Sequence, residues 1–172
     1  MKKITGKIRI LLILSLVMLN IGCDQISKTV VRQTIASNQR IEVFENNFIL
    51  TKVENRGAAY SLGSDLGPAL KVILLQVLPI IVLVFLLRLI LIKTTYSKET
   101  IIGFCCIIGG GIGNLFDRIA YGSVTDFMIM DLGIIKTEIF NMADVSIMVG
   151  SFIILITTIF NKKGSFFKEA TP

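Results

Sequence analysis

Histidine is absent from the 172-residue chain. A Ser-His-Asp or Cys-His catalytic arrangement and an HExxH zinc site each need histidine, so all three are excluded. The chain has only three cysteines, and the spacing of Cys23, Cys105 and Cys106 is typical neither of a metal site nor of a disulfide across an outer loop. We therefore expect no metal and no cofactor, and we interpret Cys105 and Cys106 as small residues inside a helix.

Charged residues are also scarce, at 17% of the chain against 53% hydrophobic residues. With a mean hydropathy of +0.76, the chain is too apolar for a soluble domain of its size. The net charge of +6 is not arranged as a basic stripe interleaved with aromatic residues, so nucleic acid is not an expected partner. The sequence predicts one integral membrane domain covering residues 1–172.

Four runs of 14 to 17 residues contain no charged side chain: Ile10–Cys23, Val72–Leu87, Thr100–Phe116 and Val145–Asn161. A helix needs about 20 residues to cross roughly 30 Å of hydrocarbon, so flanking residues must complete each span. We predict four transmembrane helices over approximately residues 9–30, 68–92, 100–118 and 141–161. The charged residues at the ends of the runs then lie at or inside the membrane boundary.

The distribution of lysine and arginine predicts the orientation. Basic residues gather before the first run, between the second and third, and after the fourth: Lys2, Lys3, Lys7, Arg9, Arg88, Lys93, Lys98, Lys162, Lys163 and Lys168. Cytoplasmic segments of membrane proteins carry such an excess, so both termini are expected in the cytoplasm. Asp24, Asp117 and Asp144 then meet at one level, near the outer leaflet.

Two segments outside the apolar runs favour β-structure. Residues 41–44 and 48–53 alternate in polarity around Asn46 and Asn47, which predicts a small hairpin. Residues 124–130 are a second β-prone segment, which either pairs with the hairpin or lies along the membrane surface.

Carboxylates are the remaining source of chemistry. A carboxylate at membrane depth costs about 2.5–3.5 kcal/mol and normally marks a functional site. Asp126 and Asp144 have no basic neighbour in the sequence. Two carboxylates held close share a proton, so one can act as general base on water while the other protonates a scissile carbonyl, as in aspartic proteases. The sequence thus predicts an intramembrane aspartyl hydrolase, in which Asn114, Arg118 and Asn141 orient the pair or stabilise the tetrahedral intermediate.

Several of these residues also have purely structural interpretations. Gly109 and Gly113 are four residues apart, a spacing typical of close helix packing. Asp117 and Arg118 could form a local ion pair that ends a helix. Asp24 and Lys28, at positions i and i+4, could pair within the bilayer, or Lys28 could extend outward to water while Asp24 ends the helix.

Five motifs occur in order along the chain: Asp24 with Lys28, Asn55–Tyr60, Gly113–Arg118, Gly122–Phe127 and Phe140–Asp144. Over nearly its whole length the chain resembles the lipoprotein signal peptidases, signal peptidase II. The resemblance implies that Asp126 and Asp144 are the catalytic dyad. It assigns site-supporting or substrate-binding roles to Asp24, Lys28, Asn55, Gly57, Asn114, Asp117, Arg118 and Asn141. Tyr60 stands where the family more often has phenylalanine.

The same resemblance implies the biology and the fold. Family enzymes cut prolipoproteins before a diacylglyceryl-modified cysteine, in the outer leaflet of the bacterial cytoplasmic (inner) membrane, without a metal, and are inhibited by globomycin. The expected partners are therefore such prolipoproteins, membrane lipids and, by resemblance, globomycin. The expected fold is a mainly α membrane protein of four transmembrane helices, with a small extracytoplasmic β-cradle and a periplasmic helix between Asn55 and Pro68.

Two other functions fit parts of the sequence. Residues 1–23 look like a signal peptide that ends in a near-match to a lipoprotein cleavage site at Cys23, so the chain could be a lipoprotein substrate. Two features argue against this: Asn20 stands three residues before the cysteine, where a leucine is usual, and three further apolar runs follow the supposed signal peptide. Membrane acids also form proton or cation relays. Here, however, the acids are expected at one end of the helices and not in a row across the bilayer.

Overall fold

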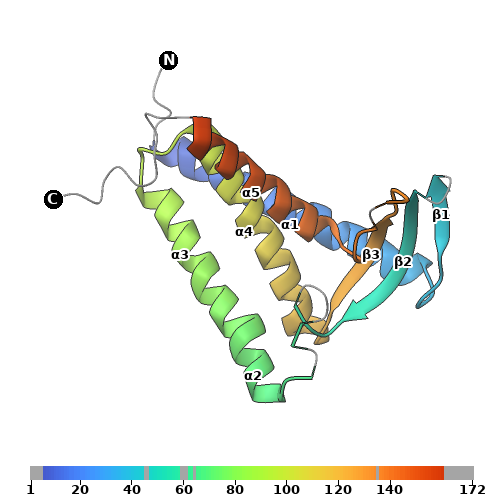
Figure 1. The fold of residues 1–172 in the computed structure, drawn as a ribbon. Helices are drawn as coiled ribbons and strands as arrows, with labels where there is room; N and C mark the ends of the chain where they lie inside the picture. Colours follow the sequence, from blue (N-terminus) through green and yellow to red (C-terminus); the bar gives the residue numbers. More distant parts are fainter. Residues whose placement is uncertain (1–5, 45–46, 59–61, 64, 135, 161–172) are drawn as a thin grey trace.

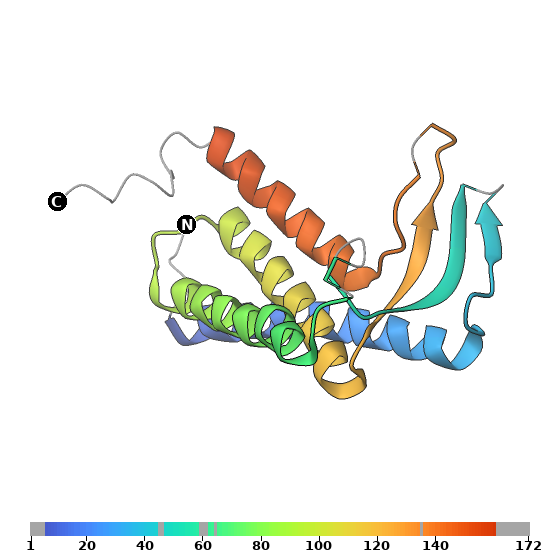
Figure 2. The ribbon, with the colours of Figure 1, turned by 60° about the horizontal axis from the view of Figure 1, so that its bottom comes forward.

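The computed structural model describes residues 6–44, 47–58, 62–63, 65–134 and 136–160. Long helices form a bundle, and a small sheet lies at one end of it (Figures 1 and 2). The helices are α1 (Gly6–Thr34), α2 (Pro68–Val72), a π-helical turn η2 (Ile73–Val77), α3 (Leu78–Ile92), α4 (Lys98–Tyr121) and α5 (Met142–Phe160). In the described part of the chain, four helical segments are long and apolar enough to cross a membrane, with residues 68–92 acting as one span. The expected mainly α fold with four helices of membrane-span length and a small sheet is confirmed.

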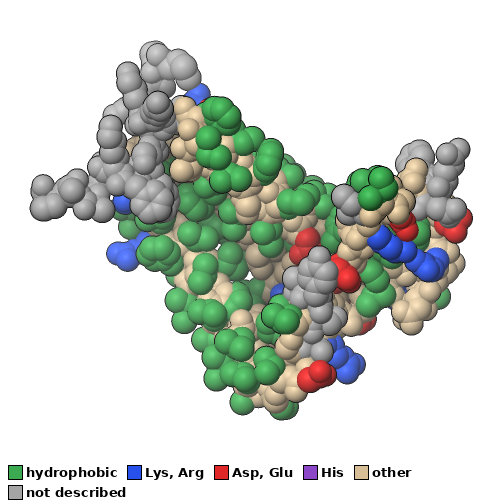
Figure 3. Space-filling model, in the orientation of Figure 1, with side chains coloured by type: hydrophobic (Ala, Val, Ile, Leu, Met, Phe, Trp, Pro, Cys, Tyr) green, Lys and Arg blue, Asp and Glu red, His purple; other side chains and the backbone are tan. Residues whose placement is uncertain are grey.

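The outer surface of the bundle is apolar. Large side chains such as Leu11, Val84 and Phe152 are more than 60% exposed, and hydrophobic side chains cover the visible face of the helices (Figure 3). Exposure of this extent would be unfavourable in water but suits contact with lipid.

Two of the helices extend beyond the apolar runs because their charged residues turn inward. Helix α1 continues through Asp24, Lys28 and Arg32 to Thr34, further than the predicted end at residue 30. Helix α4 begins at the cap residue Ser97, whose Oγ accepts a hydrogen bond from the Thr100 N–H at 3.2 Å. It ends at Gly122, whose φ of 75° allows the chain to leave the helix toward the sheet.

Helix α4 packs against α1, α3 and α5. Its glycines allow the close approach: an added Cβ at Gly110 would meet the carbonyl oxygen of Ala143, and one at Gly109 would meet the Asn20 Cβ at 2.5 Å. The close packing expected at Gly109 and Gly113 is therefore confirmed. Cys105 and Cys106 lie inside α4 as free thiols, as expected.

The sheet has three antiparallel strands in the order β1 (Ile41–Phe44), β2 (Phe48–Asn55) and β3 (Val124–Met130). The predicted hairpin is confirmed. Residues 124–130 pair with it, which is the first of the two alternatives considered for this segment. Val31 and Ile35 at the end of α1 pack against Phe127 and Met128 of β3, which joins the sheet to the bundle.

The periplasmic helix expected between Asn55 and Pro68 is not formed by the described residues of that segment. Residues 56–58, 62–63 and 65–67 form bends, turns and extended chain. Residues 59–61 and 64, including Tyr60, lie outside the described residues.

Candidate active site

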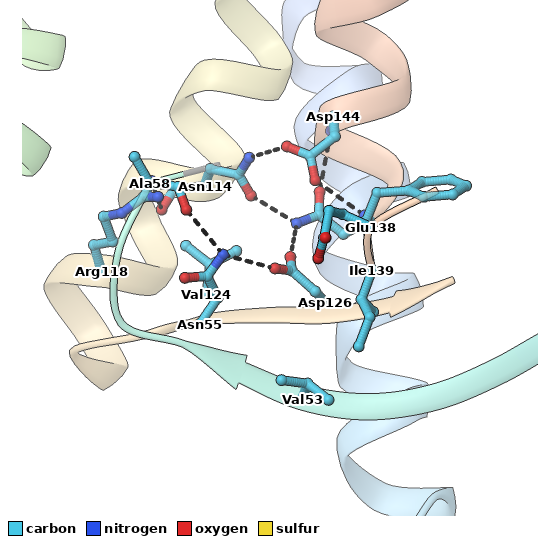
Figure 4. Close-up of a pocket in the computed structure, with 12 residues that line it drawn as sticks. Val53, Asn55, Ala58, Asn114, Arg118, Val124, Asp126, Glu138, Ile139 and Asp144 are labelled. Carbon is cyan, nitrogen blue, oxygen red and sulfur yellow. Dashed lines mark hydrogen bonds between the residues drawn. The ribbon is translucent and has the colours of Figure 1, made fainter. Parts of the chain in front are cut away.

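A cavity of about 310 Å³ opens where the sheet meets the bundle. Figure 4 shows side chains from β2, β3, α4 and the start of α5 converging on it. Six of the predicted site residues line it: Asn55, Asn114, Arg118, Asp126, Asn141 and Asp144.

Asp126 is presented by β3 and is 5% exposed. Its Oδ1 accepts a hydrogen bond from Asn141 Nδ2 at 2.6 Å, and its Oδ2 accepts one from Asn55 Nδ2 at 3.0 Å. Burial raises the pKa of Asp126 to about 6, and the nearby Asp144 charge adds to the rise, while the hydrogen bonds from the two amides oppose it. Near neutral pH this carboxyl group can therefore both hold and release a proton.

Asp144 lies in the first turn of α5. It forms a reciprocal cap with Asn141: the Asp144 N–H donates to Asn141 Oδ1 at 3.0 Å, and the Asn141 N–H donates to Asp144 Oδ2 at 3.1 Å. The other carboxylate oxygen, Oδ1, accepts from Asn114 Nδ2 at 2.8 Å. These bonds begin the helix and fix the orientation of the carboxylate.

Two amides link the two carboxylates. Asn141 Nδ2 donates both to Asp126 and to Asn114 Oδ1, the latter at 3.1 Å, and Asn114 donates onward to Asp144. Within the described ranges, neither Asp126 nor Asp144 forms an ion pair. Nor do three or more acidic or cysteine side chains of those ranges gather to hold a metal ion.

Arg118 forms the edge of the cavity near the end of β2. Its Nη2 donates to the Gly57 carbonyl oxygen at 2.9 Å, and its buried Nε has no hydrogen-bond partner. The Gly57 N–H in turn donates to Asn55 Oδ1 at 2.9 Å. The local ion pair considered for Asp117 and Arg118 is therefore wrong, because Asp117 is paired elsewhere.

A cluster of four charged residues lies behind the cavity, between α1 and α4. Lys28 Nζ lies 2.8 Å from Asp24 Oδ2 and 3.0 Å from Asp117 Oδ2, and Arg32 Nη2 lies 2.9 Å from Asp117 Oδ1. Lys28, Asp24 and Asp117 are 0% exposed. The Asp24–Lys28 pair within the membrane helix is confirmed, and the alternative in which Lys28 extends outward to water is wrong. We call these four residues the charged cluster.

The charged cluster contacts the cavity residues directly. Lys28 Nζ donates to Asn114 Oδ1 at 2.8 Å, which leaves the Asn114 amide nitrogen facing Asp144. Asp24 Oδ1 accepts from the Ala143 N–H at 2.9 Å, at the start of α5. All ten predicted site residues therefore lie in the cavity, at its edge or in the charged cluster.

Sequence reasoning missed a polar network on the other side of β3. Arg32 Nε donates to Thr125 Oγ1 at 2.8 Å, and its guanidinium carbon lies 4.1 Å from the Tyr121 ring centroid. Thr125 also donates to Glu54, which accepts from Ser123 as well. A signal for Arg32 was available, because it follows Lys28 by four residues on the same helix face.

Comparison with known families and proteins gives a consistent result. A family model described as signal peptidase (SPase) II matches residues 16–160. The lipoprotein signal peptidase of Gloeobacter violaceus is 35% identical over 144 residues, covering 82% of this chain and 78% of the relative. The lipoprotein signal peptidase of Francisella tularensis subsp. novicida is 31% identical over 150 residues, covering 87% of this chain and 92% of the relative.

Solved structures share the fold. One, described as a bacterial membrane enzyme solved by the in meso method, has a TM-score of 0.78 at 24% identity and covers 92% of this chain and 94% of its own. A second with the same description has a TM-score of 0.76 at 24% identity, with coverage of 87% and 93%.

Proposed function

The chain belongs to the signal peptidase II family, the lipoprotein signal peptidases, and we propose that Asp126 and Asp144 are its two catalytic residues. Enzymes of this family are aspartic proteases that remove signal peptides from prolipoproteins. The observation that carries the proposal is the cavity itself, where amides hold two carboxylates that form no salt bridge within the described chain, with Arg118 on the same wall.

The two aspartates divide the acid and base roles. Asp126, with its pKa raised to about 6, carries the shared proton. Asp144 takes a proton from water, the water oxygen attacks the scissile carbonyl carbon, and Asp126 protonates the carbonyl oxygen. The resulting gem-diol collapses as Asp144 gives its proton to the leaving nitrogen, and Asp126 recovers a proton from a diol hydroxyl.

The other predicted site residues support this pair. Asn55, Asn114 and Asn141 orient the carboxylates through the hydrogen bonds described above. Arg118 and Gly57 form the edge that faces substrate. Asp24, Lys28 and Asp117 act from behind the cavity by holding Asn114 and the start of α5.

The protein is a multi-pass bacterial membrane protein, and its orientation is part of the proposal. We assign it to the cytoplasmic (inner) membrane, with both termini in the cytoplasm and the active site near the outer leaflet. In support, the sheet, whose strands β2 and β3 line the cavity, lies at the end of the bundle opposite to the start of α1 and the end of α5 (Figure 1). Arg9, Lys93 and Lys98 belong to that opposite end, as expected for a cytoplasmic side.

The proposed substrates are prolipoproteins with a diacylglyceryl-modified cysteine, cut just before that cysteine, and globomycin is the proposed inhibitor. Family membership supports both assignments. The alternative in which the chain is itself cleaved at Cys23 fits the structure poorly, because Cys23 lies inside the continuous helix α1 and the next residue, Asp24, is buried.

The decisive experiment compares Asp126→Asn and Asp144→Asn with the wild type in cleavage of a diacylglyceryl-modified prolipoprotein by purified protein in liposomes. Asparagine keeps the size of the side chain but cannot transfer the proton, so each variant should lose about 10²–10⁴-fold in turnover. Asp131→Asn is the matched control, because Asp131 pairs with Lys136 outside the cavity. Near wild-type turnover in either dyad variant would refute the assignment of that residue.

A further inference from the structure

A second, larger hollow of about 630 Å³ lies at the end of the bundle away from the active site. It is formed where the start of α1, the end of α3 and the start of α4 come together (Figures 1 and 2). Most of its wall is apolar, including Ile10, Ile13, Leu16, Leu91, Ile101 and Ile102. We call it the basal groove. None of the catalytic or supporting residues assigned above lines it.

The basal groove has the length of one membrane leaflet. On α1 it runs from Gly6 to Leu16, which corresponds to about 15 Å of helix at 1.5 Å per residue. The hydrocarbon core of a bilayer is about 30 Å thick, so the groove extends through roughly half of it. Its apolar wall therefore matches the depth of a single acyl chain.

The basal groove also has cationic residues in its lining, Arg9 and Lys98. The Arg9 guanidinium donates to the carbonyl oxygens of Ile90 at 2.6 Å and Lys93 at 2.7 Å, and so closes the end of α3. In the part of the chain that the structure describes, neither Arg9 nor Lys98 forms an ion pair with a carboxylate. Arg9 and Lys98 thus bring two positive charges to an apolar channel, with the Glu99 carboxylate as an acidic neighbour of Lys98.

We propose that the basal groove is a binding site for an anionic phospholipid. One acyl chain lies along α1 and α4, and the phosphate lies between Arg9 and Lys98, whose positive charges attract it. Basic pockets between transmembrane helices recognise anionic headgroups in this way. A zwitterionic phospholipid brings its own cation to the same place, so it binds less well. The proposal does not depend on the catalytic assignment.

The test uses the purified full-length protein in neutral detergent and native mass spectrometry. Phosphatidylglycerol and phosphatidylcholine with identical acyl chains are offered in competition. The wild type should retain at least about five times more phosphatidylglycerol than phosphatidylcholine. Soluble glycerol phosphate, which has the headgroup charge but no acyl chain, should not compete.

Three variants locate the site. Lys98→Gln and the double variant Arg9→Gln/Lys98→Gln should lose most of the preference for phosphatidylglycerol. Ile102→Trp, which fills the apolar wall, should lower retention of both lipids. Arg9 bonds to three carbonyl oxygens at the end of α3, whereas the Lys98 side chain interacts electrostatically with Glu99, so the single Lys98 substitution leaves the end of α3 intact. Arg88→Gln is the matched control, because Arg88 is exposed on α3 but lies outside the groove.

Three results would contradict the lipid site. Equal retention of the two lipids by the wild type would overturn the proposal. So would an unchanged preference in both charge variants, or an equal loss in Arg88→Gln, since the latter would show only a general effect of surface charge. Because the readout is lipid retention, prolipoprotein cleavage can fail or succeed without affecting the result.

Discussion

Two groups of carboxylates lie back to back in this protein, and their partners differ. In the charged cluster, Asp24 pairs with Lys28, and Asp117 pairs with both Lys28 and Arg32. In the cavity, Asp126 and Asp144 are held only by amide N–H groups of Asn55, Asn114 and Asn141. A carboxylate fixed by a cation stays charged and structural, whereas one held by neutral amides next to a cavity can exchange a proton with substrate.

The two groups are nevertheless joined by direct bonds. Lys28 holds the oxygen of Asn114, and Asp24 holds the backbone of Ala143 at the start of α5. The charged cluster therefore orients the amides that orient the dyad. Substitutions in the charged cluster should therefore act first on stability, and substitutions of the dyad on turnover.

The largest effect on stability is expected from Lys28→Met. It leaves buried Asp24 without its cation and Asp117 with Arg32 alone, and breaking a buried ion pair typically costs about 3–5 kcal/mol. We expect a large fall in folded yield and in the thermal unfolding midpoint in detergent. Thr29→Met is the matched control, since Thr29 is the exposed neighbour on the same helix. If both variants unfolded at the same temperature, the structural role of the charged cluster would be wrong.

The next largest effect is a pH dependence of folding stability that comes from Asp126. Its pKa rises from 3.8 to about 6 in the folded protein. The folded state therefore binds the proton more tightly, and wild-type stability should fall as pH rises through this window. Relative to Asp126→Asn, the fall between pH 4 and pH 7.5 should be on the order of 2–3 kcal/mol. The fall is measured by comparing the thermal unfolding midpoints of the wild type and Asp126→Asn at pH 4 and pH 7.5. Parallel pH profiles would contradict the raised pKa.

A smaller effect is expected from Gly113→Ala in α4. The new methyl group would meet the Asp24 carboxylate, with Cγ at 3.1 Å, and so push on the charged cluster. Overpacking of this kind costs about 1–3 kcal/mol. Gly111→Ala is the matched control, because its methyl meets the flexible end of Leu83, which can rotate away. Unfolding midpoints should fall more for Gly113→Ala, and the reverse order would show that the cluster tolerates displacement.

The smallest effect is expected from Arg32→Gln. Asp117 keeps Lys28, so the cost should be near the value for one hydrogen bond, about 1 kcal/mol. Because Arg32 also holds Thr125, the residue before Asp126, turnover should fall while KM stays unchanged. Arg32→Lys should recover part of the turnover, and Arg40→Gln, at an exposed arginine before β1, should have no effect. A change confined to KM would argue against a role in positioning β3.

Much of the fold followed from local patterns. The apolar runs predicted four helices, the alternation around Asn46 and Asn47 predicted the hairpin, and the spacing of Asp24 and Lys28 predicted their pair. The extension of α1 to Thr34 did not follow. Charged residues normally signal the end of a membrane helix, and here Lys28 and Arg32 are neutralised by Asp117 of another helix.

The partner of Asp117 shows the limit of sequence neighbours. Arg118 is adjacent in sequence, yet successive side chains of a helix do not face each other. Asp117 therefore points to α1, while Arg118 points to the cavity edge and bonds to Gly57. Glu54, Ser123 and Thr125 were missed for a related reason, since their contacts join two strands and a helix that are distant along the chain.

The sequence by itself determined the number of helices, the absence of histidine-based chemistry and the set of aspartates and amides from which a site could be built. Only the tertiary structure decided which aspartates are neutralised and which are not. The physical reason is that a carboxylate takes its role from the groups within hydrogen-bond distance. For Asp117 and Asp126 most of those groups come from distant parts of the chain, and Asp24 and Asp144 each accept one hydrogen bond from another helix or its start.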